Sequence, residues 1–92
     1  MKLLINDKTY IAPKPKARLF REALVITKQN DLEDMNADTL DALLGFVTDV
    51  FKKEFSIDDI YDSLESDELV PTVVAAIQFV TGGGDKEEDG KK

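Results

Sequence analysis

The spacing of apolar residues along the chain predicts four helices after a short stretch of strand-forming residues. The most regular helical stretch runs from residue 37 to residue 51 and follows Asn36, a residue type that favours the N-cap position. Its apolar positions recur at the helical period. They are Leu40, Leu43, Leu44, Val47, Val50 and Phe51. We expect this helix to form the centre of the core.

An earlier helix is expected from Lys16 to about Lys28. Its expected core face consists of Phe20, Ala23, Leu24 and Thr27, with Leu19 and Ile26 at the edges. The other side carries basic residues such as Arg18 and Arg21. We interpret that basic side as a solubilising face rather than a binding patch.

Residues 55 to 84 predict a short capped helix, a longer helix and a glycine stop. Ser56 is a preferred N-cap, and Asp59 follows three residues later in an Asp version of the capping box. The short helix should present one apolar face. That face consists of Ile57, Ile60, Tyr61 and Leu64. The longer helix opens at Ser66, and Pro71 is either its true first residue or the site of a slight kink.

The longer helix carries more apolar surface than one core-facing stripe needs. The stripe expected to meet the core consists of Val70, Val73, Val74, Ile77 and Val80. Phe79 projects away from it, beside Ala76, and two interpretations stay open. Phe79 either covers a satellite cluster within the chain or docks another protein. The expected partner-binding residues are Leu69, Thr72, Ala75, Ala76 and Phe79.

Residues 2 to 12 predict a β-hairpin, because strand-forming residues flank Asn6 and Asp7, which tolerate turn conformations. A lone hairpin is marginal in water, so it should lie against helices. The expected fold is therefore mainly α (α+β), with a short N-terminal β-hairpin packed on a bundle of about four helices. Residues 1–81 should form one globular domain. Residues 82–92, rich in glycine and charge, should form a disordered tail that is either inert or a flexible tether.

Basic and acidic residues are concentrated in different parts of the chain. The net charge is −7, but residues 1–30 hold seven basic and two acidic residues, whereas residues 31–68 hold two basic and thirteen acidic ones. The acidic middle repels phosphate, which argues against nucleic-acid binding. The two halves either attract each other within one fold or mediate head-to-tail self-association. The residues expected to take part in self-association are Lys14, Lys16, Arg18, Arg21, Asp58, Asp59 and Asp62.

The residues that most catalytic and metal sites require are missing. The chain has no Cys and no His, and it contains no phosphate loop, dinucleotide fingerprint or nucleophile-and-base arrangement. The abundant acids stand at helix starts, where they serve as caps. We therefore expect no enzyme activity, no cofactor and no metal. No apolar run reaches the roughly 20 residues of a membrane span, and no signal peptide is recognised, so an intracellular protein is expected.

Three stretches resemble the tail assembly chaperones of long-tailed bacteriophages and prophages. They are the opening Met1-Lys-Leu-Leu-Ile-Asn-Asp-Lys8, the stretch Phe55-Ser-Ile-Asp-Asp-Ile-Tyr-Asp62, and the ending Val80-Thr-Gly-Gly-Gly84. The resemblance covers most of the chain and rests on hydrophobic patterns, caps and length rather than on a catalytic signature.

The resemblance implies a function. Such chaperones bind the tape measure protein, keep its apolar helices soluble in the host cytoplasm and are absent from the mature virion. Many are also made in a longer form by ribosomal frameshifting, and the extension is thought to recruit the tail tube subunit. Two other classes stay open: an acidic regulator or inhibitor, such as an anti-repressor or DNA mimic, and a structural head or tail adaptor.

Overall fold

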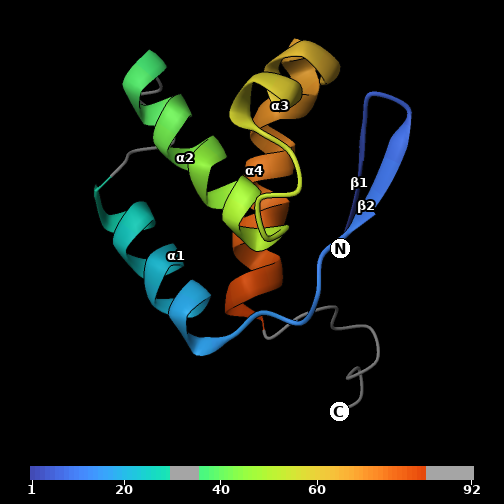
Figure 1. The fold of residues 1–92 in the computed structure, drawn as a ribbon. Helices are drawn as coiled ribbons and strands as arrows, with labels where there is room; N and C mark the ends of the chain where they lie inside the picture. Colours follow the sequence, from blue (N-terminus) through green and yellow to red (C-terminus); the bar gives the residue numbers. More distant parts are fainter. Residues whose placement is uncertain (30–35, 83–92) are drawn as a thin grey trace.

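The computed structural model describes residues 1–29 and 36–82. Within these ranges it consists of the elements β1 (Lys2–Ile5), β2 (Lys8–Ile11), α1 (Ala17–Gln29), α2 (Ala37–Val50), α3 (Ile57–Ser63) and α4 (Ser66–Thr81). The predicted fold class is confirmed, since an N-terminal hairpin lies beside a bundle of four helices (Figure 1). Apart from Gly82, the tail expected over residues 82–92 lies outside the described residues.

The hairpin closes through a two-residue turn in the left-handed conformation. Asn6 and Asp7 have φ values of 52° and 66°, the conformation that matches the twist of two antiparallel strands. One face of the hairpin meets the helices: Ile5 is buried, and the ring of Tyr10 lies edge-on to Phe55, with centroids 4.8 Å apart. The Asn6 backbone N–H also donates to Ser63 Oγ at 2.9 Å, which fixes the turn to the end of α3.

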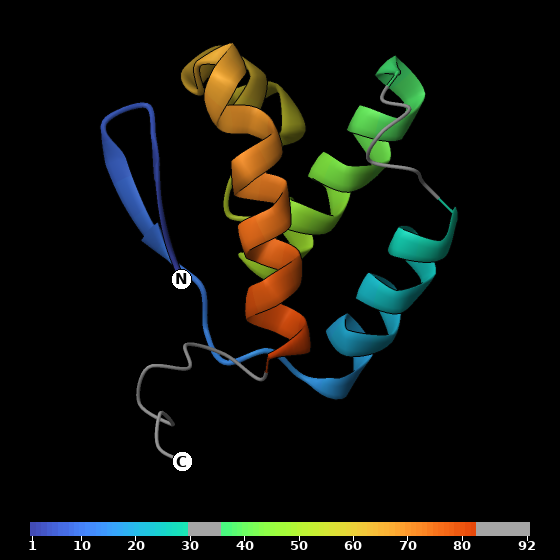
Figure 2. The same cartoon turned by 180° about the vertical axis from the view of Figure 1, so that it is seen from behind.

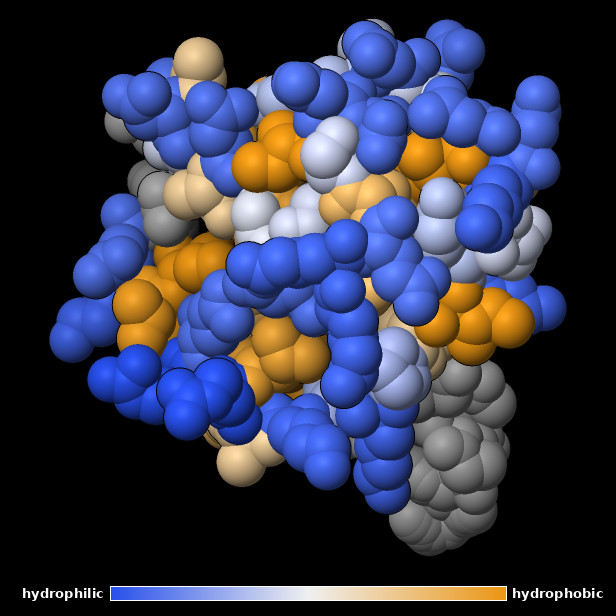
Figure 3. Space-filling model, in the orientation of Figure 1, coloured by the Kyte–Doolittle hydropathy of each residue, from blue (hydrophilic) through white to orange (hydrophobic). Residues whose placement is uncertain are grey.

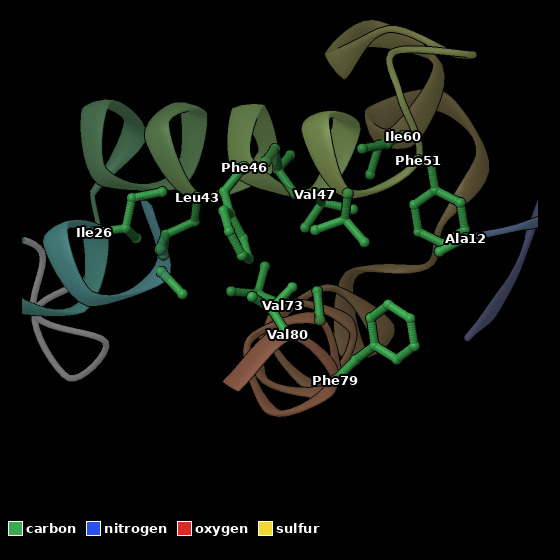
Figure 4. Packing of buried hydrophobic residues seen from close by; sticks show 14 of the residues in the cluster. Ala12, Ile26, Leu43, Phe46, Val47, Phe51, Ile60, Val73, Phe79 and Val80 are labelled. Carbon is green, nitrogen blue, oxygen red and sulfur yellow. The ribbon is translucent and has the colours of Figure 1, made fainter. Parts of the chain in front are cut away.

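Helix α2 is the centre of the core, as its periodicity predicts. It packs against α1, α3 and α4. Its N-terminus is capped by Asn36, whose Oδ1 accepts a hydrogen bond from the Thr39 N–H at 2.9 Å. Figure 4 shows Phe46 and Val47 of α2 pointing toward α4. Phe46 is not among the apolar positions expected to form the core face of this helix, but it is fully buried as well.

Helices α3 and α4 begin with caps made by acidic side chains. In α3 the Asp59 carboxylate accepts from the Ser56 N–H at 2.9 Å, and Ser56 Oγ accepts from the Asp59 N–H at 3.1 Å, so the predicted capping box is confirmed. In α4 the Glu68 carboxylate accepts from the Glu65 N–H at 2.9 Å. Pro71 lies inside α4, so it is not the first residue of the helix.

The buried face of α1 differs from the expected one. Ala23 and Ile26 are buried and Leu19 is half-buried, whereas Phe20 and Leu24 are 44% and 53% exposed. The face is rotated because α1 packs against both α2 and α4. Ala23 lies at the centre of the buried face and is fully buried.

The buried face of α4 differs as well. Val73, Ala76, Phe79 and Val80 are buried, while Val70 is 40% exposed. Helix α4 is packed against α1 and α2. Figure 4 shows the Phe79 ring on the side of the core where Phe51 and Ala12 lie. Because neighbouring elements contact α4 from more than one side, the buried part of its surface is wider than the single apolar stripe that the sequence predicts.

Candidate protein-binding surface

The outer face of α1 carries an apolar stripe that reaches the surface. Ala17, Phe20 and Leu24 follow one another at i, i+3 and i+7, so they share a helix face. They form one side of a groove of about 330 Å³, which we call the α1 groove. Its lining residues are Pro15, Lys16, Ala17, Phe20, Arg21, Leu24 and Val80. Apolar side chains gather among hydrophilic ones over α1 in the space-filling view (Figure 3).

Basic residues surround this apolar stripe. Lys16 and Arg21 line the α1 groove itself. An adjacent hollow of about 450 Å³ shares Lys16 and adds Lys14, Arg18 and other residues from the connector, α1 and α2. The structure thus brings the four basic residues of the self-association prediction to one end of the molecule, beside exposed apolar side chains.

A carboxyl pair lies beside the basic residues, between α1 and α2. Burial, a hydrogen bond with Asp49 and the negative charge of Asp49 raise the pKa of Glu22 to about 7, although Lys53 opposes the shift. Asp49 also forms an ion pair with Lys53, with 3.2 Å between Oδ1 and Nζ. Glu22 is therefore partly protonated near neutral pH, which leaves the surrounding segment more positive.

The Glu22→Gln variant should change how stability depends on pH. The unfolded chain releases the Glu22 proton near the ordinary glutamate pKa of 4.5, and the folded chain near 7, so stability falls as pH rises between these values. Glutamine cannot ionise, so the variant should lose less stability between pH 5 and pH 8 than wild type does. Thermal melts at both pH values measure this, with Glu54→Gln as the exposed control. An equal loss in Glu22→Gln and wild type would contradict the shifted pKa.

A second groove, the hairpin groove, lies between the hairpin and the helices α3 and α4. It encloses about 840 Å³. Its apolar lining includes Leu3, Leu64, Pro71 and Ala75. Its acidic lining residues are Asp7, Asp62, Glu65, Asp67 and Glu68. The two grooves therefore combine apolar surface with opposite charge.

The predicted partner-binding residues do not share one surface in the structure. Thr72 and Ala75 line the hairpin groove, and Leu69 is half-buried against the core. Ala76 is fully buried and Phe79 is only 8% exposed, so the expectation that these two are open to a partner is wrong. The structure instead exposes Phe20 and Leu24 of α1, which the sequence pattern places in the core. The sequence signal for this surface is the spacing of Phe20 and Leu24, one helical turn apart at the side of α1 away from Ile26.

The acidic residues of the self-association prediction lie far from the basic ones. Asp58, Asp59 and Asp62 belong to α3, at the opposite end of the molecule from the start of α1 in both views (Figures 1 and 2). Asp59 is already engaged, because its carboxylate caps α3. The opposite charges are thus separated within one molecule rather than paired across it.

The class of protein is indicated by what the chain is similar to. No group of three or more metal-ligating side chains occurs in residues 1–29 and 36–82, and no helix there is long and apolar enough to span a membrane. Comparisons with curated proteins and with solved structures find no match. A family model described as "Phage tail chaperone protein" matches residues 1–92. The match confirms the resemblance, and the chain belongs to the phage tail chaperone family.

Proposed function

We propose that this tail chaperone binds the tape measure protein in the host cytoplasm and keeps its apolar helices soluble until the tail tube forms. The observation that supports this most directly is the exposed apolar stripe of Phe20 and Leu24, which are 44% and 53% exposed. Exposed apolar surface rimmed by polar residues is typical of protein-interaction sites. The family itself is generally non-enzymatic, which agrees with a binding function.

The proposal includes recruitment of tail tube subunits through a longer, frameshifted form of the chain. Val80 lines the α1 groove, and α4 ends one residue later, at Thr81. The C-terminal end of α4 therefore lies beside the groove. The chaperone itself should be absent from the mature virion, which mass spectrometry of purified particles would test.

Co-expression with the tape measure protein tests the central proposal. The tape measure protein alone should be largely insoluble, and it should become soluble and co-purify with this chain when both are made together. Residues 1–92 should be sufficient for this binding, because the groove lies within the described residues. A client that stays insoluble, or that becomes soluble without binding the chain, would contradict the proposal.

A homo-oligomer is part of the same proposal. The basic residues near the start of α1 and the acidic residues of α3 lie at opposite ends of the molecule, which suits a head-to-tail contact between copies. Contacts between exposed charges are screened by salt. Sedimentation of a concentrated sample should therefore show association at low ionic strength that weakens as salt is added. A monomer at low salt would rule this contact out.

A further inference from the structure

We infer that the α1 groove is the client site, and that its occupant is an amphipathic helix whose apolar stripe is flanked by acidic residues. The inference rests on the proposed function, because it assigns the client's binding site and the chemistry of the bound segment. Three observations support it: the geometry of the exposed stripe, the charge of the rim, and the opposite charge of the hairpin groove.

The geometry of the stripe fits a helix. Phe20 and Leu24 are separated by one turn of α1, and Ala17 extends the stripe toward the N-terminus of the helix. A partner helix can lay side chains at i, i+3, i+4 and i+7 against such a stripe. A partner in strand conformation gains its affinity from an unpaired sheet edge, whereas the backbone groups inside a helix such as α1 are already hydrogen-bonded to one another. The contact must therefore be made by side chains.

The rim determines the charge of the occupant. Residues 12–29 hold five basic residues and one acidic residue, Glu22. The pKa of Glu22 is raised, and its hydrogen bond is made with Asp49 of α2. Lys16 and Arg21 line the groove and can reach acidic side chains beside a bound apolar stripe. Acidic flanks should therefore strengthen binding and speed association.

The hairpin groove is the alternative site on this surface, and its charge discriminates against the same occupant. Its lining includes five acidic side chains, which repel a helix with acidic flanks. Thr72 and Ala75, predicted to bind the partner, lie in that groove rather than beside α1. The basic rim of the α1 groove thus attracts an acid-flanked client helix, and the acidic lining of the hairpin groove repels it.

The experiment uses the full chain and two sets of fluorescent peptides. One set is a series of overlapping helix-length peptides that spans the tape measure protein. The other is a designed pair of helices that share one apolar stripe and differ only in glutamate or lysine flanks. Fluorescence anisotropy gives the affinity of each for wild type, for Phe20→Ser combined with Leu24→Ser, and for Arg21→Glu. Ile11→Ser is the matched control, because Ile11 is a 68% exposed apolar residue of the hairpin.

Wild type should bind acid-flanked tape measure peptides and prefer the glutamate-flanked helix to the lysine-flanked one. The double variant should lose at least about tenfold in affinity, since aromatic anchors dominate such contacts. Arg21→Glu should abolish the preference for glutamate, and Ile11→Ser should bind like wild type. Thermal melts should show all variants folded, because the substituted side chains are exposed.

Two results would overturn the inference: undiminished binding by the double variant, or equal affinity for the two designed helices. Failure of the proposed function looks different. Wild type would then bind no tape measure peptide and would not co-purify with the full-length protein. In that case the two designed helices still test the inferred preference of the α1 groove. Preferential binding of the glutamate-flanked helix through Phe20 and Leu24 would support that preference. Absence of binding by both designed helices would contradict it.

Discussion

Replacing Leu44 by Ala should lower the free energy of unfolding by about 2–5 kcal/mol, the usual cost of removing buried methyl groups and leaving a cavity. Leu44 is fully buried in α2, the helix that packs against α1, α3 and α4. Because helices surround Leu44 on several sides, neighbouring side chains have little freedom to move into the space that the substitution leaves. A domain of this size is only marginally stable, by about 5–15 kcal/mol in general, so the loss is a large fraction of the total.

Urea unfolding followed by circular dichroism measures this difference, and Leu4→Ala is the matched control. Leu4 is 57% exposed on the outer face of the hairpin, so the same substitution there removes little buried surface. Its effect should be within about 0.5 kcal/mol, as for most surface substitutions. If Leu44→Ala were as stable as Leu4→Ala, α2 would not be the centre of the core.

The elements that the sequence predicts well are those specified by local signals. Asn6 and Asp7 mark the hairpin turn because both residue types accept a positive φ. Ser56 and Asp59 mark the start of α3 because each caps the backbone N–H of the other. Helix α2 has one clear apolar face and a capping Asn36. In each case the deciding interaction lies within a few residues of the chain.

The orientations of α1 and α4 could not be predicted in the same way. Apolar residues cover so much of the circumference of both helices that periodicity supports more than one core face. In α1 the expected core face includes both Phe20 and Ala23, and the structure buries Ala23 but leaves Phe20 44% exposed. In α4 burial favours Val73 over Val70. The choice depends on which neighbouring helices each side meets, and that information is spread over distant parts of the chain.

The candidate site follows from the same ambiguity. The sequence predicts surplus apolar surface on the helix of residues 66–81, at Phe79 and Ala76, but both of these side chains are buried. Phe79 belongs to the core cluster, on the side where Phe51 and Ala12 lie, whereas Phe20 and Leu24 of α1 are exposed (Figure 4). The basic residues near the start of α1, interpreted from the sequence as a solubilising face, are thereby placed around an exposed stripe.

Phe79→Ala should destabilise the protein by about 3–5 kcal/mol, the usual cost of removing a buried phenylalanine ring. Phe79 is 8% exposed and belongs to the core cluster, so the truncation leaves a cavity between α4 and its neighbours. Phe20→Ala is the matched control. Its ring is 44% exposed and its loss should change the melting temperature little.

The two phenylalanine variants separate a core residue from a binding residue when stability and client binding are measured on the same samples. Phe79→Ala should melt at a clearly lower temperature, and at temperatures where it is still folded it should retain the client. Phe20→Ala should melt like wild type and bind the client more weakly. A stable Phe79→Ala variant that fails to bind the client would place the client site on α4, contrary to the burial of the Phe79 ring. The exposed stripe of α1 would then have no part in client binding.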